Sequence, residues 1–153
     1  MDLDYGIGLS AYMVDTLSRE RRSWLMGRVP HFDTKPEMAV RKMLYGMGYR
    51  YRLHRKDLPG RPDIALPKMK KAIFVHGCFW HRHDCKKATT PKSNGSFWLD
   101  KFDQNVKRDR KALADLSELG WEAVIVWECE VSDLERLADK LANFLEHANA
   151  NPA

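Results

Sequence analysis

Cysteine is scarce in this 153-residue chain, and its three cysteines cannot all pair within one molecule. A scaffold held by disulfide bonds is therefore not expected, and a reducing compartment suits free or metal-bound thiols better. No apolar run approaches the roughly 20 residues of a membrane span. The start of the chain, with Asp2 and Asp4 and no apolar stretch, does not resemble a signal peptide. These absences predict a cytoplasmic protein without a membrane partner.

Internal repeats, low-complexity tracts and signs of a second domain are also lacking. A hydrophobic content of 44% and a charged content of 31% are ordinary for a globular protein. The net charge of +5 and the pI near 9.2 favour an anionic partner. We expect a tail over residues 1–18, where no periodicity is clear, followed by one domain over residues 19–148.

Turn residues and hydrophobic periodicity predict three helices and four strands. Thr34 and Glu37 have the spacing of a capping box, so a helix should begin near Thr34 and end before Gly46. A long helix is expected over residues 97–119. A last helix should open at Ser132 and turn Leu134, Leu137, Leu141 and Leu145 inward.

The strands are expected over residues 49–53, 63–66, 72–76 and 122–127. The last of these is almost continuously apolar, which suggests burial on both faces. The order of the elements predicts an α/β protein with a mixed central sheet flanked by helices.

Residues 71–85 combine a strand-like run with three histidines and two cysteines. Structural zinc sites use four nitrogen or sulfur ligands, with thiolates preferred. Cys78, His83 and Cys85 are candidates from one loop, and Cys129, after the last strand, is the remaining cysteine. Spacing alone does not separate His83 from His81. Small buried thiols are the alternative, which is weaker because every cysteine in the chain belongs to the set.

A second group of residues has the chemistry of phosphodiester cleavage. Asp63 follows a Pro-Gly turn, His76 ends a strand, and His81 lies on the next loop. Imidazoles can act as general acid or base near neutral pH, and a carboxylate can hold a metal ion. Taken singly, Asp63 could be a turn residue and His81 a solvated one.

Two more carboxylates stand on helix faces that are otherwise apolar. Asp109 lies between Val106 and Leu113 on the inward stripe of the long helix, where an unpaired charge is costly. A salt bridge with an arginine or a partnership with His76 or His81 would explain it. Glu37 is either part of the active site or only the second half of the capping box.

Several aromatic and basic residues are candidates for DNA contact. Phe79 and Trp80 lie between Cys78 and His81, so a zinc-held loop could present their rings to a base step. Met26, in an arginine-rich segment, could act from the other groove. Core packing is the alternative for each of them. Trp98 lies near the start of the long helix, whose basic stretch includes Asn105 and Arg108 and could bind phosphate.

The chain resembles the very short patch repair (Vsr) endonucleases of the PD-(D/E)xK nuclease superfamily over about residues 19–146. The motifs that carry the resemblance are T-K-P-E at 34–37, L-P-G-R-P-D at 58–63, F-V-H-G-C-F-W-H-R-H-D-C at 74–85, F-W at 97–98, N-V-K-R-D-R at 105–110 and V-W-E-C at 126–129. The resemblance implies a restriction-endonuclease-like three-layer fold with one structural zinc.

The implied activity is a magnesium-dependent nick of double-stranded DNA, 5′ to the thymine of a T:G mismatch left by deamination of 5-methylcytosine. Mg²⁺ would be held by Asp63 and the backbone carbonyl of Val75. The resemblance matches the other residues to roles as well: His76, His81, Asp109 and Glu37 in the active site, Cys78, His83, Cys85 and Cys129 on zinc, Met26, Phe79 and Trp80 in intercalation, and Trp98 in DNA contact. It further implies a bacterial monomer acting on the nucleoid, with mismatch-repair proteins as additional partners.

The sequence is also compatible with two other functions. A nuclease of the same fold with a different DNA target has less need of intercalating rings than a mismatch enzyme. A non-catalytic, zinc-stapled DNA-binding module would not need the acidic and imidazole side chains of Asp63, His76, His81 and Asp109.

Overall fold

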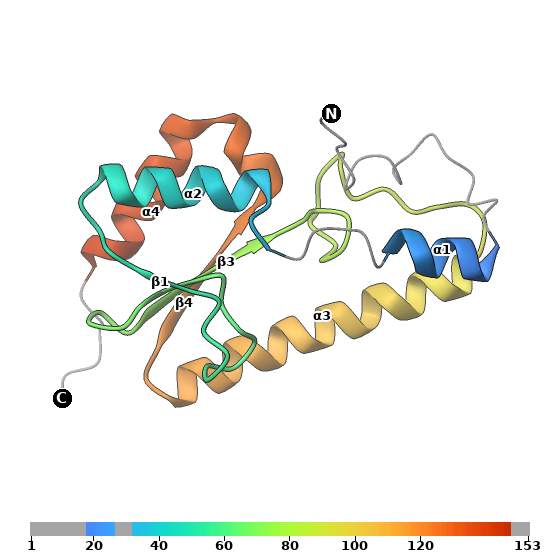
Figure 1. Cartoon of the computed structure of the whole chain (residues 1–153), viewed down its shortest axis with the longest axis horizontal. Helices are drawn as coiled ribbons and strands as arrows, with labels where there is room; N and C mark the ends of the chain where they lie inside the picture. Colours follow the sequence, from blue (N-terminus) through green and yellow to red (C-terminus); the bar gives the residue numbers. More distant parts are fainter. Residues whose placement is uncertain (1–17, 27–31, 148–153) are drawn as a thin grey trace.

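Four strands form one mixed sheet with helices on both of its faces (Figure 1). The computed structural model describes residues 18–26 and 32–147. In chain order the elements are α1 (Arg19–Met26), α2 (Lys35–Gly46), β1 (Arg52–Leu53), β2 (Ile64–Leu66), β3 (Lys71–His76), α3 (Gly95–Glu118), β4 (Glu122–Trp127), the 3₁₀ helix η1 (Glu128–Ser132) and α4 (Leu134–Glu146). None of the helices in these ranges has the length and apolar character that a membrane span requires.

The strand order is β1-β2-β3-β4, with antiparallel pairing up to β3 and a parallel pair between β3 and β4. Helix α3 makes the crossover that a parallel pair requires. Six residue pairs join β3 to β4, from Lys71 opposite Glu122 to His76 opposite Trp127. The carboxyl ends of these two strands are therefore neighbours, and the segments that follow them meet.

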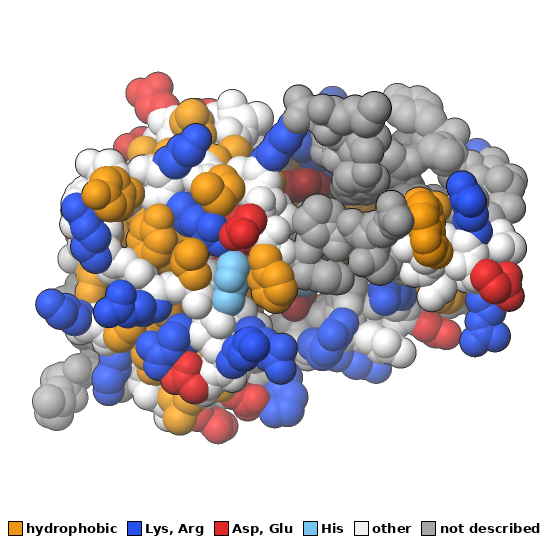
Figure 2. Space-filling model, viewed as in Figure 1, with side chains coloured by type: hydrophobic (Ala, Val, Ile, Leu, Met, Phe, Trp, Pro, Cys, Tyr) orange, Lys and Arg blue, Asp and Glu red, His pale blue; other side chains and the backbone are white. Residues whose placement is uncertain are grey.

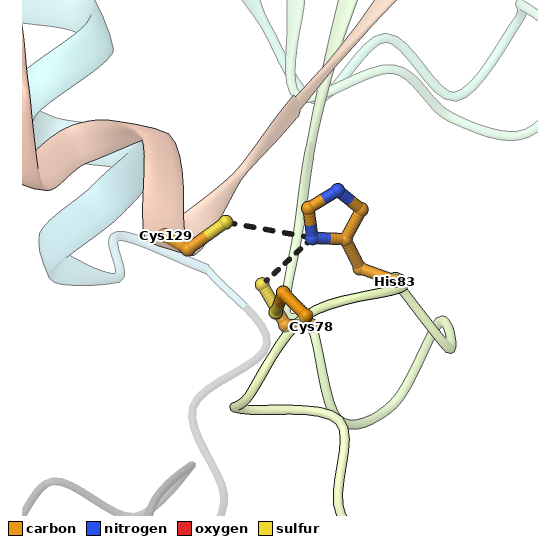
Figure 3. A group of neighbouring side chains, drawn as sticks. Cys78, His83 and Cys129 are labelled. Atoms are coloured by element: carbon orange, nitrogen blue, oxygen red, sulfur yellow. Dashed lines mark hydrogen bonds between the residues drawn. The ribbon is translucent and has the colours of Figure 1, made fainter.

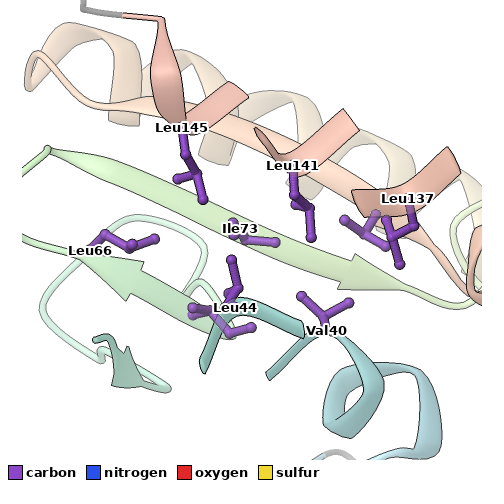
Figure 4. Packing of buried hydrophobic residues seen from close by; sticks show 9 residues of the cluster. Val40, Leu44, Leu66, Ile73, Leu137, Leu141 and Leu145 are labelled. Atoms are coloured by element: carbon purple, nitrogen blue, oxygen red, sulfur yellow. The ribbon is translucent and has the colours of Figure 1, made fainter. Parts of the chain in front are cut away.

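Helices α2 and α4 cover one face of the sheet, and α3 covers the other (Figure 1). Figure 4 shows how α2 and α4 pack against β3. Val40 and Leu44 come from α2, and Leu137, Leu141 and Leu145 come from α4; all five are buried. Each such side chain contributes on the order of 1.5–3 kcal/mol by leaving water. The arrangement confirms the predicted fold class.

A second cluster joins the other sheet face to α3, with Phe74 and Ala72 packed near Ala112 and Leu116. Gly60 lies at the edge of this cluster with φ +74°, and a Cβ there would lie 2.4 Å from the Cβ of Ala112. The turn before Asp63 therefore requires glycine both for its backbone angle and for its approach to α3.

The helix ends differ in detail from the sequence prediction. Thr34 caps α2, because its hydroxyl accepts from the N–H of Glu37. Helix α4, in contrast, is capped by Asp133 and not by Ser132, which belongs to η1. Leu134 is 53% exposed, so its predicted inward position was wrong. It is the first residue of α4, one turn before the buried face begins.

Two other expectations needed correction. Strand β4 is at the edge of the sheet, and only Val126 within it is fully buried, so burial on both faces was wrong. The strands buried on both faces are β2 and β3. The arginine-rich segment, for which we predicted no element, forms the helix α1. Most of the predicted tail, residues 1–17, lies outside the described residues.

Candidate active site and metal centre

Asp63 lies immediately before β2, between the neighbouring strands β1 and β3. Its backbone carbonyl accepts from the N–H of His54 at 3.1 Å, and its side-chain Oδ2 accepts from the N–H of Val75 at 2.7 Å. The pKa of this carboxyl is raised to about 6, mainly by burial and also by the charge of Glu37, while the Val75 hydrogen bond has the opposite effect. A carboxylate held in such surroundings gains from a nearby cation.

His76, His81 and Asp109 form one contact group beside the end of β3. The imidazole rings of His76 and His81 stack with their centroids 3.8 Å apart and their planes at 9°. Asp109 reaches them from α3: its Oδ2 lies 2.6 Å from Nδ1 of His81 and 3.9 Å from Nδ1 of His76. The carboxylate on the apolar stripe of the long helix is thus explained by an imidazole partner.

His76 is held in its neutral form. Its pKa is lowered to about 3, mainly by burial and also by the charge of His81, while Asp109 acts in the opposite direction. Within the described part of the chain, Nδ1 of His76 is a buried atom without a hydrogen-bond partner. Because an unpaired buried polar atom is costly, this nitrogen is suited to a water or substrate atom.

Glu37, on α2, belongs to a second charged group, which it forms with Asp33, Arg41 and His54. Its side chain is 2% exposed, and its Oε1 lies 2.6 Å from Nη2 of Arg41 and 2.5 Å from Nε2 of His54. The same Nη2 of Arg41 lies 2.8 Å from Asp33. Since the carboxylate of Glu37 bonds Arg41 and His54, this residue is more than the second half of a capping box.

His54 was missed by the sequence reasoning. It follows β1 with φ +47°, outside any periodic pattern, and only its place opposite Asp63 in the hairpin could have indicated it. The charges of Glu37 and His54 both act on the pKa of Asp63, as does that of His81. Asp63 is therefore flanked by two imidazole–carboxylate pairs, His81 with Asp109 and His54 with Glu37.

Cys78, His83, Cys85 and Cys129 converge at the carboxyl ends of β3 and β4. One ligand atom from each lies within 4.8 Å of the others. Nδ1 of His83 lies 3.6 Å from Sγ of Cys78 and 3.4 Å from Sγ of Cys129 (Figure 3). Ordinary zinc–sulfur and zinc–nitrogen bonds at a tetrahedral angle would separate such atoms by about 3.5 Å. This group fits a zinc ion.

Spacing left the choice between the two histidines open, and their contacts favour His83 as the zinc ligand. His81 is engaged by Asp109, whereas the ring of His83 stacks on Trp127 with centroids 4.4 Å apart and turns Nδ1 toward the sulfurs. The parallel pairing of β3 with β4 brings Cys129 near Cys78. Burial raises the pKa of both thiols, and a bound dication is what would hold them as thiolates.

The rings expected to contact DNA are less exposed than predicted. Phe79 is 1% exposed and packs edge-on against Trp98 and Phe102, and Trp98 is fully buried. An outward-facing Phe79 was therefore wrong for this structure, because the three rings remove one another from water. Trp80 is partly buried at the margin of this cluster.

Asn105 is likewise buried, and its amide donates to the carbonyl of Trp80 at 3.0 Å. Arg108, which is exposed, donates to the side-chain oxygen of Asn105. Asn105 therefore supports the loop that carries Trp80, and its direct contact with DNA stays a prediction. Met26 ends α1, and its side chain lies outside the described residues.

Basic side chains cover the face that carries β1. Figure 2 shows Lys and Arg gathered over β1 and the segment that follows it. The exposed basic residues there are Arg50, Arg52, Lys56 and Arg61. Such a surface beside Asp63 favours a phosphate backbone as the partner.

Comparison with known proteins finds relatives over most of the chain. A family model described as DNA mismatch endonuclease Vsr matches residues 14–87. The chain is 49% identical over 134 residues to the type II nicking enzyme V.XorIIP of Xanthomonas oryzae pv. oryzae, covering 88% of this chain and 98% of the relative. It is 40% identical over 128 residues to the DNA mismatch endonuclease Vsr of Escherichia coli, covering 84% and 82%.

A further relative is the type II nicking enzyme V.NmeAIP of Neisseria meningitidis, 44% identical over 121 residues, with 79% of this chain and 86% of that enzyme covered. Among solved structures, the catalytic domain of the homing endonuclease I-Bth0305I matches with a TM-score of 0.53 and 22% identity. The match covers 73% of this chain and 94% of that domain, so the two share a fold.

Proposed function

Because this chain belongs to the Vsr family of DNA endonucleases, we propose that it nicks double-stranded DNA on the 5′ side of the thymine in a T:G mismatch. Endonucleolytic hydrolysis of DNA follows from the family. The target is the proposal, and it is supported by the name of the Escherichia coli relative and by the partly exposed Trp80 beside the candidate site.

The observation that carries the proposal is the position of Asp63 between two imidazole–carboxylate pairs. Nδ1 of His81 faces Asp109, which leaves Nε2 to take a proton from a water nucleophile. His76, kept neutral by burial and stacked on His81, restricts the orientation of that ring. Asp109 would stabilise the imidazolium that forms.

The metal ligands expected here are Asp63 and the carbonyl of Val75, which lie next to each other through the hydrogen bond between Oδ2 and the Val75 N–H. The partly buried carboxyl of Asp63 and the nearby charge of Glu37 fit a hard divalent cation, and we propose Mg²⁺. When bound, such an ion supplies Lewis-acid polarisation of the phosphate.

The four-ligand cluster is proposed as a structural zinc site. Its ligands Cys78, His83 and Cys85 bracket the loop that carries Trp80 and His81, and Cys129 ties that loop to the end of β4. The ion would therefore fix the position of His81 relative to Asp63 without joining the chemistry. We propose that Trp80 meets the mismatched step, since Phe79 is occupied in the aromatic cluster.

Nicking at a different DNA target is the second candidate, because several relatives are named only as type II nicking enzymes. A non-catalytic module is disfavoured, since the whole set of acidic and imidazole side chains is in place.

The experiment is cleavage of end-labelled duplexes that differ only in a T:G, T:A or C:G pair, with randomised flanking positions, in Mg²⁺ and in chelator. A nick confined to the thymine strand of T:G duplexes in Mg²⁺ is the expected result. Equal nicking of all three duplexes would overturn the mismatch assignment, and no cleavage in any condition would favour the binding module.

A further inference from the structure

His54 is built into the candidate active site on two sides. Its backbone N–H donates to the carbonyl of Asp63 at 3.1 Å, which extends the β1–β2 pairing by one step. Its Nε2 lies 2.5 Å from Oε1 of Glu37. One residue therefore bonds both the carboxylate of Glu37, on α2, and the backbone of Asp63, immediately before β2.

The contacts of Glu37 are unevenly divided between its two oxygens. His54 and Arg41 both bond Oε1, and the guanidinium of Arg41 is shared with Asp33. A carboxylate that is 2% exposed needs such partners to offset its lost hydration. Because both partners hold Oε1, they restrict the rotation of the carboxylate, and among the described residues Oε2 is the oxygen that keeps its capacity for another ligand.

The ring of His54 is also restricted from its other side. Phe32 lies against it with ring centroids 4.7 Å apart, and the side chain is 24% exposed. The backbone has φ +47°, which asparagine tolerates better than most residues. The imidazole is thus pinned by a neighbouring ring, a strand-like hydrogen bond and an ion pair.

We propose that His54 is a positioning residue of the nuclease centre, which orients Glu37 so that Glu37 and Asp63 act together on a divalent cation. The proposal rests on the proposed function and extends it to a residue for which no role was predicted. Partners that orient metal-binding carboxylates commonly change metal affinity by roughly 10- to 100-fold when removed. Arg41 alone, divided between Glu37 and Asp33, would leave the carboxylate free to rotate.

Two substitutions separate positioning from a purely structural role. His54→Asn introduces a side chain that tolerates the positive φ but is too short to reach Glu37. His54→Gln introduces a longer side chain, whose amide N–H can reach about as far as Nε2 of the imidazole. We expect His54→Asn to weaken Mn²⁺ binding to the zinc-loaded, DNA-free protein by about 10-fold or more, measured by calorimetry. His54→Gln should restore most of the affinity. Arg55→Ala, at the adjacent surface pair with Asp57, is the matched control and should bind Mn²⁺ like the wild type.

Kinetics and a double-mutant cycle test whether His54 acts on metal binding through Glu37. The kcat for nicking should fall in His54→Asn with the KM for DNA unchanged. In a Glu37→Gln background the same substitution should have little further effect on Mn²⁺ affinity, because the positioned group is already altered. Wild-type Mn²⁺ affinity in His54→Asn, or an equal loss in both backgrounds, would overturn the proposal. A wild-type protein that nicks no T:G duplex would refute the proposed function, while the Mn²⁺ titrations would still decide the role of His54.

Discussion

Nδ1 of His81 lies 2.6 Å from Oδ2 of Asp109, and this contact joins the loop after β3 to the middle of α3. The contact selects one tautomer of the imidazole, in which Nδ1 carries the proton and Nε2 has a free lone pair. The same carboxylate lies 3.9 Å from Nδ1 of His76, so one side chain of α3 acts on both stacked rings.

Asp109→Asn should preserve the fold and DNA binding but lower kcat by roughly 10²- to 10⁴-fold, because the amide no longer enforces the tautomer or stabilises the imidazolium. Single-turnover nicking of a T:G duplex measures the effect. Asp103→Asn, on the exposed side of the same helix, is the control and should nick normally. Wild-type turnover in Asp109→Asn would remove this carboxylate from the mechanism.

Asp63→Ala should abolish nicking and leave binding to the T:G duplex within a few-fold of the wild type. The carboxylate is partly buried and accepts from the N–H of Val75, so we expect it to serve the metal and not the DNA-docking surface. Gel-shift titration and nicking assays on one preparation give both quantities. Asp57→Ala, in an exposed ion pair nearby, should change neither. Normal nicking by Asp63→Ala would refute the assignment.

His76 should make the folded protein less stable in acid. Its pKa is lowered by burial from the ordinary value of 6.5 to about 3, so between these pH values the unfolded chain binds a proton that the folded protein does not. The free energy of unfolding therefore decreases as the pH falls through this range.

His76→Asn removes that contribution. Between about pH 7.5 and about pH 5, the wild type should lose on the order of 1–2 kcal/mol more stability than the variant, as measured by urea unfolding. The raised pKa of Asp63 acts in the opposite direction, but it is present in both proteins and cancels in the comparison. Parallel pH profiles would show that His76 titrates normally in the folded state.

Cys129→Ser should lower the zinc content below one equivalent and reduce the melting temperature, because metal binding contributes to folding free energy. Elemental analysis and thermal melts provide the readout. Ser132→Ala alters the same 3₁₀ turn without removing a ligand and should keep its zinc. One full equivalent of zinc in Cys129→Ser would exclude this thiol from the site.

Substitutions of Phe79 and Trp80 should have different effects. The first should lower folding stability more, and the second should lower mismatch recognition more. Phe79→Leu should cost on the order of 1–3 kcal/mol of folding stability, since the ring is 1% exposed against Trp98 and Phe102. Trp80→Ala should cost less stability and lose more preference for T:G over T:A duplexes. Denaturant unfolding and competition binding test both. A larger loss of T:G preference in Phe79→Leu than in Trp80→Ala would assign the intercalating role to Phe79.

The sheet and the three helices that cover its two faces could be predicted because their signals are local. Thr34 and the glycines after Tyr45 mark α2, and the leucines of α4 repeat at helical spacing. The position of β4 at the sheet edge could not be predicted, since an apolar run such as residues 122–127 is compatible with either place. Leu134 was misplaced because the cap lies one residue later than the Ser132 pattern suggests.

The candidate site was predicted where residue type limits the chemistry and missed where only the fold brings groups together. Cysteine and histidine ligands, and a carboxylate on an apolar stripe, are recognisable without coordinates. His54 has no such mark, because its importance comes from the hairpin register that sets it opposite Asp63. Phe79 was assigned to the surface because a loop position does not reveal the ring cluster beneath it.

The parallel pair of β3 and β4 has a consequence for synthesis on the ribosome. Asp63, His76 and His81 all leave the exit tunnel well before β4. Until residues 122–129 have emerged, β3 lacks its parallel neighbour β4, and the loop that carries Cys78, His83 and Cys85 lacks Cys129. A nascent chain would therefore carry most of its candidate active-site groups in an unassembled state, and it would become a nuclease only after β4 and Cys129 have left the tunnel.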